Sequence, residues 1–435
     1  MTLVRTFMKT GLKEKIQNNL QYPLYALIVL LPWQARYIAK QGYLGGAEWE
    51  YATLSVYAVD VFFVILLLIS FLFHDRVQIQ KYKKGISIVL ALTAYILFSL
   101  VFSPYENTHV VGLLRIFITL TVILSLFFIT WRRKYIFIAL SAAGIWAGAF
   151  GACQFFFGEV FGNTLLGISS QHPLTQGVSV LEVEGLRLLR AYGSLSHPNI
   201  LGGLLATSIL STVALLGMYT KRVIRICILF MLALQSFFLV ITFSRSAFLG
   251  LIAGLLVAGL VILYKKKIFD LQYVSSFLTI IVVLSASAII FSNEIQSRFS
   301  GNRLEGISVI ERVESIDSVK NLFSSHYFLG TGFNTYTEAL AEADESMQPA
   351  WTYQPVHNID LLLLVELGIV GAILLTFTFV FYIRNVFKKT FTDERIFHVS
   401  ILIALGVIAI FDHYLVSSHF GLLLVSVVFS LSKDD

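Results

Sequence analysis

The residues with the clearest chemical potential lie in a short polar segment, from Gln354 to Asn358, that opens a strongly apolar stretch. Its histidine, His357, has a reference pKa of about 6.5 and can therefore act as an acid or a base at the edge of a membrane. Gly368 and Gly371 follow along the apolar stretch, where the lack of a side chain lets another helix approach closely. This segment is the first candidate for a catalytic site.

A tight turn between two apolar stretches carries Arg245, with Ser244 and Ser246 on either side. The serines can bind a phosphate group or cap the next helix, whose N-terminus also attracts anions. A guanidinium keeps its charge near lipid and can bind phosphate oxygens with two parallel hydrogen bonds. The turn is therefore a candidate site for a lipid-linked phosphate or pyrophosphate.

Two further arginines lie in polar segments with similar potential. Arg190 opens a segment that leads through His197 and Asn199 into an apolar helix, and Arg312 lies in an amphipathic stretch upstream of His357. If these arginines converge at a membrane surface, they favour the same anionic ligand. The alternative is that they pair with nearby carboxylates. Arg36 and Arg115, close to the ends of apolar stretches, are instead interpreted as side chains that extend toward the membrane surface.

The composition is that of a membrane protein. Of the 435 residues, 57% are hydrophobic and 13% are charged, and the mean hydropathy is +0.79, whereas soluble domains have about a quarter of charged residues. Apolar runs long enough to cross about 30 Å of hydrocarbon predict ten spans, near residues 22–39, 52–73, 86–103, 109–130, 135–157, 199–218, 223–243, 246–264, 272–291 and 358–382. The tail, 397–431, can hold two shorter spans separated at Phe411-Asp412-His413.

The chain is thus predicted to be one all-α membrane domain, 1–435, with about twelve transmembrane helices. Most of its 32 basic residues fall in alternate connections, so both termini are predicted to be cytoplasmic. The two long connections, 158–198 and 292–357, then lie outside, and their patterns predict short amphipathic helices. Asp60, Glu366, His413 and His419 are interpreted as ordinary polar contacts between helices.

Several chemistries lack their motifs. The sequence has no HxxxH or HExxH pattern, no cysteine near a histidine and no Asp-x-Asp pair, so no metal is predicted. A glycine-rich phosphate loop is missing too, which leaves ATP-driven transport unsupported. No cofactor and no nucleic-acid partner are expected.

His357-Asn358, nine residues, Gly368, two residues and Gly371 resemble a family signature, His-(Asn/Ser/Gln)-x9-Gly-x2-(Gly/Thr/Tyr). This is the signature of the bacterial O-antigen ligase and O-antigen polymerase superfamily of integral-membrane glycosyltransferases. The segments 328–333, 190–199 and 244–246 are similar to other parts of that superfamily. The resemblance is close over roughly residues 185–385.

The resemblance implies a GT-C-like fold and an enzyme of the bacterial inner membrane, surrounded by membrane lipids. It implies a glycan donor on undecaprenyl pyrophosphate and a metal-independent, inverting transfer. His357 would be the base, Arg245, Arg190 and Arg312 would bind pyrophosphate, and Asn358 would orient the donor or the histidine. A ligase uses a lipid A core sugar as acceptor, a polymerase uses another glycan, and some relatives use protein hydroxyls.

The favoured function is therefore lipopolysaccharide O-antigen ligation, with polymerisation or protein O-glycosylation as the alternatives. An acidic stretch from Glu338 to Glu345 would repel an acidic acceptor unless it is folded away. A secondary transporter is the main rival from another class, because about twelve helices are common there. A scaffold without activity would leave the placement of the arginines unexplained.

Overall fold

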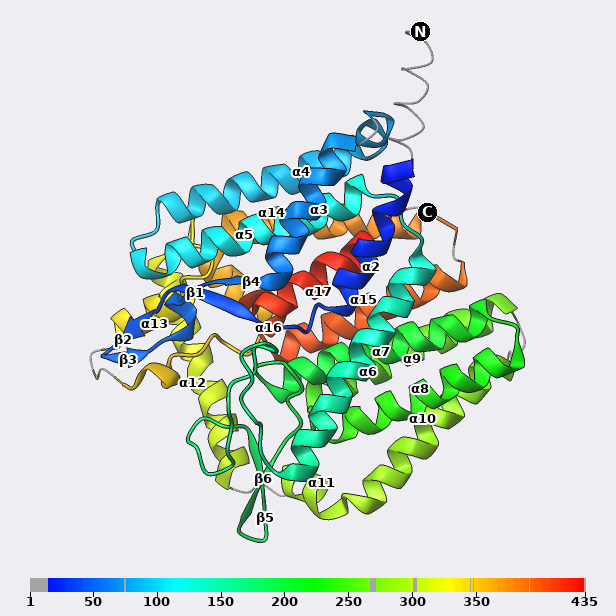
Figure 1. Cartoon of the computed structure of the whole chain (residues 1–435). Helices are drawn as coiled ribbons and strands as arrows, with labels where there is room; N and C mark the ends of the chain where they lie inside the picture. Colours follow the sequence, from blue (N-terminus) through cyan, green and yellow to red (C-terminus); the bar gives the residue numbers. More distant parts are fainter. Residues whose placement is uncertain are drawn as a thin grey trace.

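The computed structural model describes residues 15–73, 76–266, 271–299, 303–344, 346, 348–390 and 392–433. Within these ranges, nine helices are long and apolar enough to cross a membrane (Figure 1): α4 (Arg76–Val101), α5 (Glu106–Phe128), α6 (Arg133–Phe157), α7 (Pro198–Met218), α8 (Arg222–Val240), α9 (Arg245–Lys266), α10 (Leu271–Ile290), α14 (Ile359–Phe387) and α15 (Asp393–Phe411). Two shorter apolar helices are α3 (Ala58–Phe73) and α17 (His419–Ser430). The predicted all-α, polytopic membrane bundle is confirmed.

Shorter elements occupy the connections. They are α2 (Gln21–Val29), β1 (Arg36–Lys40), β2 (Tyr43–Leu44), β3 (Ala47–Glu48), η1 (Glu50–Ala52), β4 (Leu54–Tyr57), β5 (Val180–Val183), β6 (Leu186–Leu189), α11 (Ser292–Phe299), α12 (Arg303–Ser325), α13 (Tyr336–Ala343), η2 (Ala350–Thr352) and α16 (Tyr414–Ser417). Most of these lie at the left and lower edges of Figure 1, away from the chain ends. We call this side, formed by residues 36–57, 158–197 and 292–357, the loop face.

The first predicted span, 22–39, is wrong. Helix α2 ends at Val29, and the chain becomes extended as β1, which pairs antiparallel with β4 from Arg36↔Tyr57. Pro32 explains the end, because proline lacks the N–H that a continuing helix needs and disfavours helical geometry in the residue before it. Since β4 occupies residues 54–57, the second span begins only at Ala58.

The two long connections differ from each other. The segment 292–357 contains the helices α11, α12 and α13, as predicted, but 158–198 contains the hairpin β5–β6 instead of an amphipathic helix. Glu184 and Gly185, the two residues between these strands, have φ angles of 51° and 81°. Two successive positive φ angles are typical of the tight turns that suit a hairpin.

Helix α7 lies at the centre of the bundle. In the most apolar stretch of this helix, 94% of the residues are buried. Its polar side chains are hydrogen-bonded inside the core. Thr212 Oγ1 donates to Gln235 Oε1 on α8 at 2.8 Å, and Gln235 Nε2 donates to Ser208 Oγ at 2.8 Å. A satisfied buried network favours one packing arrangement. It holds α7 as the fixed element against which α6, α8, α9 and α15 pack.

Helix α14 is interrupted at Gly368, whose φ of 62° and ψ of −173° belong to a region that only glycine adopts readily. The backbone of the segment 327–332 enters the gap. Thr331 donates its N–H to Val365 O at 2.9 Å, and Ile369 donates to Tyr327 O at 2.9 Å. The prediction that a helix approaches Gly368 is therefore wrong, because a loop does. At Gly371 a helix does approach, with Tyr95 of α4 in contact.

Substitution Gly368→Ala is expected to cost about 3 kcal/mol or more of stability, because a Cβ would be strained by the backbone and would collide with Phe328 O. Thermal unfolding in detergent measures the loss. Gly406→Ala is the matched control, since α15 leaves open space there and alanine favours a helix by about 1 kcal/mol. Equal unfolding temperatures for the two variants would contradict the interpretation of Gly368.

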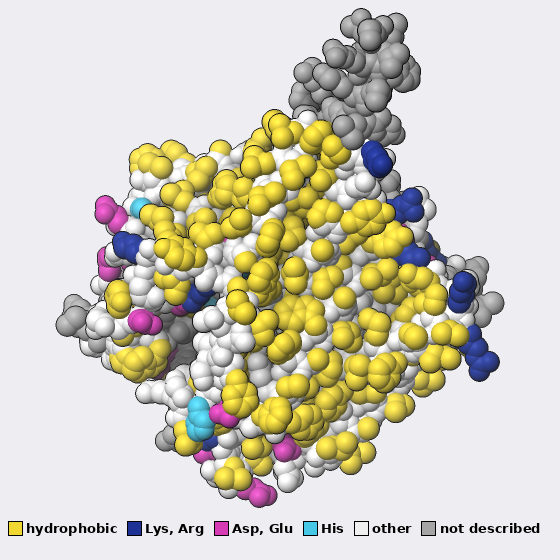
Figure 2. Space-filling view, viewed as in Figure 1, with side chains coloured by type: hydrophobic (Ala, Val, Ile, Leu, Met, Phe, Trp, Pro, Cys, Tyr) yellow, Lys and Arg dark blue, Asp and Glu magenta, His cyan; other side chains and the backbone are white. Residues whose placement is uncertain are grey.

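The surface agrees with a membrane location. Figure 2 shows a broad apolar face over the helices, with Lys and Arg side chains gathered along the right edge near the chain ends. Asp and Glu side chains lie along the left and lower edges, over the loop face. Some Lys and Arg side chains also lie at the left edge, so the apolar face separates a basic rim from a rim of mixed charge.

Candidate functional site

His357 is held at the start of α14 by its neighbour. Asn358 is the N-cap of this helix, with its side-chain oxygen accepting the Leu361 N–H at 2.9 Å. Its Nδ2 donates to Ile410 O at 3.1 Å and so ties α14 to the end of α15. The His357 side chain beside this cap is 36% exposed, which leaves it accessible to a substrate.

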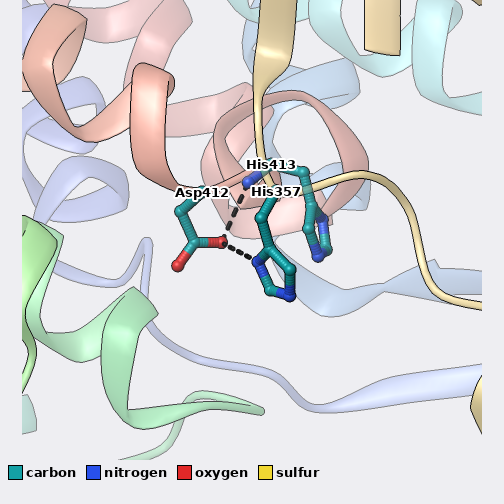
Figure 3. Close-up of side chains that lie close together, drawn as sticks. All are labelled: His357, Asp412 and His413. Atoms are coloured by element: carbon teal, nitrogen blue, oxygen red, sulfur yellow. Dashed lines mark hydrogen bonds and ion pairs between the residues drawn. The ribbon is translucent and has the colours of Figure 1, made fainter. Parts of the chain in front are cut away.

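A buried carboxylate faces His357. Asp412 follows the last residue of α15, and its side chain is only 6% exposed. Its Oδ1 lies 3.9 Å from His357 Nδ1, while His357 Nε2 points away from it (Figure 3). At this distance the carboxylate can pair with the imidazolium after proton uptake and stabilise its charge. The pair His357–Asp412, called the dyad below, is thus arranged for a base acting through Nε2.

The carboxylate is fixed by two donors. Its Oδ1 accepts the His413 N–H at 2.9 Å, and its Oδ2 accepts Asn199 Nδ2 at 2.8 Å. Asn199 lies in the first turn of α7, so the dyad is attached to the central helix. Because the oxygen of Asn199 accepts Arg190 Nη2 at 2.8 Å, a chain of hydrogen bonds runs from Arg190 to Asp412.

Arg190 is a buried member of this chain. The residue is 3% exposed, and its guanidinium also donates to Thr242 O at 2.8 Å and to Ser179 Oγ at 2.7 Å. These bonds connect the segment 158–198 with the turn that precedes Arg245. The charge of Arg190 therefore lies close to the dyad, while its donors are directed at protein groups.

Three histidines surround Asp412. Burial raises the pKa of the carboxyl, but His413, His357 and His197 outweigh burial and hold this pKa below its ordinary value. Burial, together with the charge of Arg190, lowers the pKa of His197 to about 3. Burial lowers the pKa of His413 to about 4 against the attraction of Asp412. Near neutral pH the cluster therefore holds a carboxylate between neutral His197 and His413.

The free energy of unfolding is expected to fall as the pH is lowered from 7 to 5. Below pH 6.5 the unfolded chain protonates His197 and His413, whereas the folded protein keeps both neutral until about pH 4 or lower. The unfolded state then binds more protons, which costs about 1 kcal/mol per pH unit for each histidine. Asp412 acts in the same direction at still lower pH.

Thermal unfolding in detergent at a series of pH values measures this effect. Substitution His413→Gln removes one of the two groups and is expected to reduce the slope of unfolding temperature against pH. The exposed His172 is the control position, and His172→Gln should leave the slope unchanged. The same slope in His413→Gln and in the unsubstituted protein would contradict the assignment.

The cluster also has the composition of a small metal site. His357, Asp412 and His413 offer ligand atoms within 4.8 Å of one another, close enough to bind one ion. Asp412 already accepts two hydrogen bonds, and His413 Nδ1 lies 2.6 Å from Ser417 Oγ. A metal would have to compete with these partners. Metal-independent chemistry stays a prediction that a chelator tests.

Two other predicted ligands lie on other helices, Arg245 on α9 and Arg312 on α12. Arg245 is the first residue of α9, where its Nη1 donates to Arg298 O of α11 at 3.4 Å. The buried Ser244 and Ser246 place their hydroxyl oxygens 3.4 Å from each other. On α12, Arg312 is partly buried, and its Nε finds no hydrogen-bond partner in the part of the chain that the structure describes.

Of the predicted site residues, the structure thus brings Arg190, Asn199 and Asn358 to His357, while Arg245 lies at the start of α9 and Arg312 lies on α12. Sequence reasoning missed Asp412 and interpreted His413 only as a contact within a helix pair. One signal was available. Two adjacent polar residues interrupt a 35-residue apolar tail at the end of a predicted span, on the side predicted for His357.

Comparison with known families gives one match. Residues 228–376 match a family described as O-antigen ligase, and this range contains Arg245, His357 and Gly368. No curated protein matches the chain. The resemblance noted in the sequence is confirmed, and such a domain implies glycosyltransferase-like ligase or polymerase chemistry on glycan and lipid substrates in the membrane. The chain is thus a multi-pass membrane protein in which residues 228–376 match an O-antigen ligase domain, and this match supports the O-antigen ligase and O-antigen polymerase superfamily.

Proposed function

We propose that the protein transfers a glycan from undecaprenyl pyrophosphate to an acceptor hydroxyl, with a sugar of the lipid A core as the favoured acceptor. The observation that carries the proposal is the dyad. Asp412 faces Nδ1 of His357, whose ring is 36% exposed and belongs to the segment that carries the family signature. An accessible histidine beside a buried carboxylate suits proton removal from a hydroxyl.

In the proposed reaction, His357 Nε2 takes the proton of the acceptor hydroxyl while that oxygen attacks the anomeric carbon. The bond between this carbon and the pyrophosphate oxygen breaks with inversion, and its electron pair leaves with the pyrophosphate. Asp412 stabilises the imidazolium, which later releases the proton to water. A general base of this type contributes about 10²- to 10⁴-fold to the rate.

Positive charge is proposed to stabilise the leaving group. Arg245 and Arg312 are assigned to the pyrophosphate oxygens, because guanidinium groups bind phosphate with strong, charge-assisted hydrogen bonds. Arg312 supports the assignment, since its Nε has no hydrogen-bond partner within the described residues. Arg190 is proposed to add positive charge near the leaving group. Its guanidinium also donates a hydrogen bond to Asn199, which in turn donates one to Asp412.

The acidic stretch in the segment 292–357 bears on the acceptor. Glu338 is 2% exposed and its carboxylate accepts four hydrogen bonds from Asn107 and Thr108 at the start of α5. Asp344 accepts bonds from Ser346 and Tyr353. Two members of the stretch are therefore folded into the protein, which supports an acceptor that carries negative charge, as a phosphorylated core sugar does.

Transport receives less support. The interrupted α14 is the feature that a transporter would share, since broken helices form transporter sites at mid-membrane. Here the freed backbone groups of Val365 and Ile369 are hydrogen-bonded to the segment 327–332. The arrangement supports a helix start that holds His357 rigidly. Both termini are proposed to be cytoplasmic, with the loop face external.

The test combines purified protein with an undecaprenyl-pyrophosphate glycan and one acceptor at a time: lipid A core, a second donor glycan, or a serine-containing peptide. Glycan on the lipid A core, with undecaprenyl pyrophosphate released, is the expected result, and EDTA should not change the rate. Transfer only to the glycan or the peptide would identify the polymerase or the protein-glycosylating alternative. Strong inhibition by EDTA would point to a metal at the cluster His357, Asp412 and His413.

A further inference from the structure

A second polar site lies between β4, α5 and α17. A cavity of about 40 Å³ opens there, with room for a few water-sized groups. Its polar lining consists of Arg36, Glu50, Thr53, Ser55, Tyr57, Asp60, Arg115, Thr119 and His419. From the sequence, Arg36 and Arg115 were interpreted as side chains near the ends of apolar stretches that extend toward the membrane surface. Their position in one cavity calls for a different explanation.

Most of the charge in this cavity is paired. Both guanidinium nitrogens of Arg36 donate to the Glu50 carboxylate. His419 Nε2 lies 2.6 Å from Asp60 Oδ1, and the ring of His419 is stacked on Tyr57 with centroids 3.7 Å apart. Both carboxylates in the lining are therefore already engaged with a cationic or imidazole partner.

Arg115 is the exception. Its Nη1 donates to the neutral side-chain oxygen of Asn334, and no carboxylate of the described residues lies within ion-pair distance of it. A partly buried guanidinium without a carboxylate at ion-pair distance is costly in a membrane protein. Such a group suits an anionic ligand, because carboxylate and phosphate oxygens match the guanidinium fork.

The same cavity has two further polar atoms without partners. Ser55 Oγ and His419 Nδ1 are buried, and neither has a hydrogen-bond partner among the residues that the structure describes. Ser55 is 7% exposed. Leaving such atoms unpaired is unfavourable, so a bound ligand that hydrogen-bonds them gains affinity. A ligand that carries hydroxyl groups next to an anionic group could bind the Arg115 guanidinium and also hydrogen-bond Ser55 and His419.

The cavity is connected to the dyad through Asn334. This residue, which accepts the bond from Arg115, lines a smaller cavity of about 10 Å³ together with Pro355 and Ser417. Pro355 precedes His357 by two residues, and Ser417 Oγ lies 2.6 Å from His413 Nδ1. A ligand held at Arg115 is therefore next to the elements that position the catalytic histidine.

We propose that Arg115, with Ser55 and His419, forms a subsite for an anionic substituent of a sugar, either a carboxylate or a phosphate. The cavity volume suits such a substituent and is too small for a whole sugar ring. The subsite deepens the proposed function, on which it rests for the identity of the glycan as substrate. It would select glycans that carry negative charge near the reacting sugar.

Saturation-transfer NMR of the full chain in detergent tests the proposal with three sugars: glucose, glucuronate and glucose 6-phosphate. At least tenfold tighter binding of one anionic sugar than of glucose is expected, and the tighter one shows whether the natural group is a carboxylate or a phosphate. Arg115→Gln should remove the preference. Equal binding of all three sugars, or an unchanged preference in Arg115→Gln, overturns the subsite.

Two further variants guard against loss of folding in Arg115→Gln. Asn334→Asp places a carboxylate against Arg115 and should abolish the preference without removing the arginine, whereas Arg115→Lys should retain part of it. Lys320→Gln is the matched control, because it removes one exposed loop-face charge far from any cavity lining. A retained preference in Asn334→Asp also overturns the subsite.

The same measurement on His357→Ala separates the two proposals. Anion preference should persist in this variant, because His357 does not line the cavity. If His357→Ala still transfers glycan while the preference depends on Arg115, the subsite stands and the catalytic assignment fails. If transfer depends on His357 but the anion preference does not depend on Arg115, the catalytic assignment stands and the subsite fails.

Discussion

Substitution His357→Ala is expected to lower the rate of glycan transfer by about 10²- to 10⁴-fold at saturating donor and acceptor. The imidazole is the proposed acceptor of the hydroxyl proton, and alanine offers no group that could replace it. Since His357 is 36% exposed and Asn358 caps α14, the loss of the ring should leave the helix and its membrane insertion intact. A transfer assay with purified protein, paired with thermal unfolding, measures both effects.

The exposed His172, on another segment of the loop face, provides the matched control. His172→Ala should transfer glycan at the rate of the unsubstituted protein. Donor binding, measured separately, should remain within a few-fold in His357→Ala because the arginines are unchanged. A rate in His357→Ala within threefold of the unsubstituted protein would remove His357 from the reaction.

Substitution Asp412→Asn is expected to lower the turnover rate by about 10- to 100-fold, the size of effect found when a partner that orients a functional histidine is lost. The amide keeps an oxygen and can still meet Asn199 or His413, so the fold should survive, but it lacks the charge that stabilises the imidazolium. The loss should appear in kcat, with the KM of the donor nearly constant, because Asp412 is buried and meets no substrate.

Asn199→Ala should act in the same direction as Asp412→Asn and more weakly, since it frees one carboxylate oxygen from its donor. Asp317→Asn removes an exposed carboxylate of α12 and serves as the control. If Asp412→Asn raises the KM of the donor at constant kcat, the carboxylate affects substrate binding and the dyad interpretation is wrong.

Local sequence signals predicted most of the helical framework. Hydropathy identified the long spans because each backbone polar group within a membrane must be satisfied inside its own segment. The polar break at Phe411-Asp412-His413 is confirmed between α15 and α16. His357 was found from its position at the mouth of an apolar stretch and from the spacing to Gly368 and Gly371, all of which lie within the matched range 228–376.

The partner of His357 could not be found in this way. Asp412 lies 55 residues further along the chain, and the two meet only because Asn358 and Asn199 attach the ends of α14 and α7 to the end of α15. Such contacts depend on helix packing, which hydropathy does not encode. The burial of Arg190 has the same origin, since its partners come from three separate segments.

Backbone geometry explains the remaining differences. The first apolar run satisfies the length rule for a span, but Pro32 ends the helix and pairing of β1 with β4 replaces the missing hydrogen bonds. At Gly368 the pattern correctly marked a close approach, yet it did not distinguish a neighbouring helix from a loop that enters a break. Only the φ of 62° makes that distinction.

In the proposed reaction, the His357–Asp412 dyad activates an acceptor hydroxyl for attack on a glycan that is linked to a lipid pyrophosphate. The most direct measurement quantifies released undecaprenyl pyrophosphate and glycosylated acceptor in the same reaction, with EDTA present. The prediction is one molecule of each per turnover for the unsubstituted protein and neither product above background for His357→Ala. Release of undecaprenyl monophosphate, or equal amounts of product from His357→Ala, would contradict it.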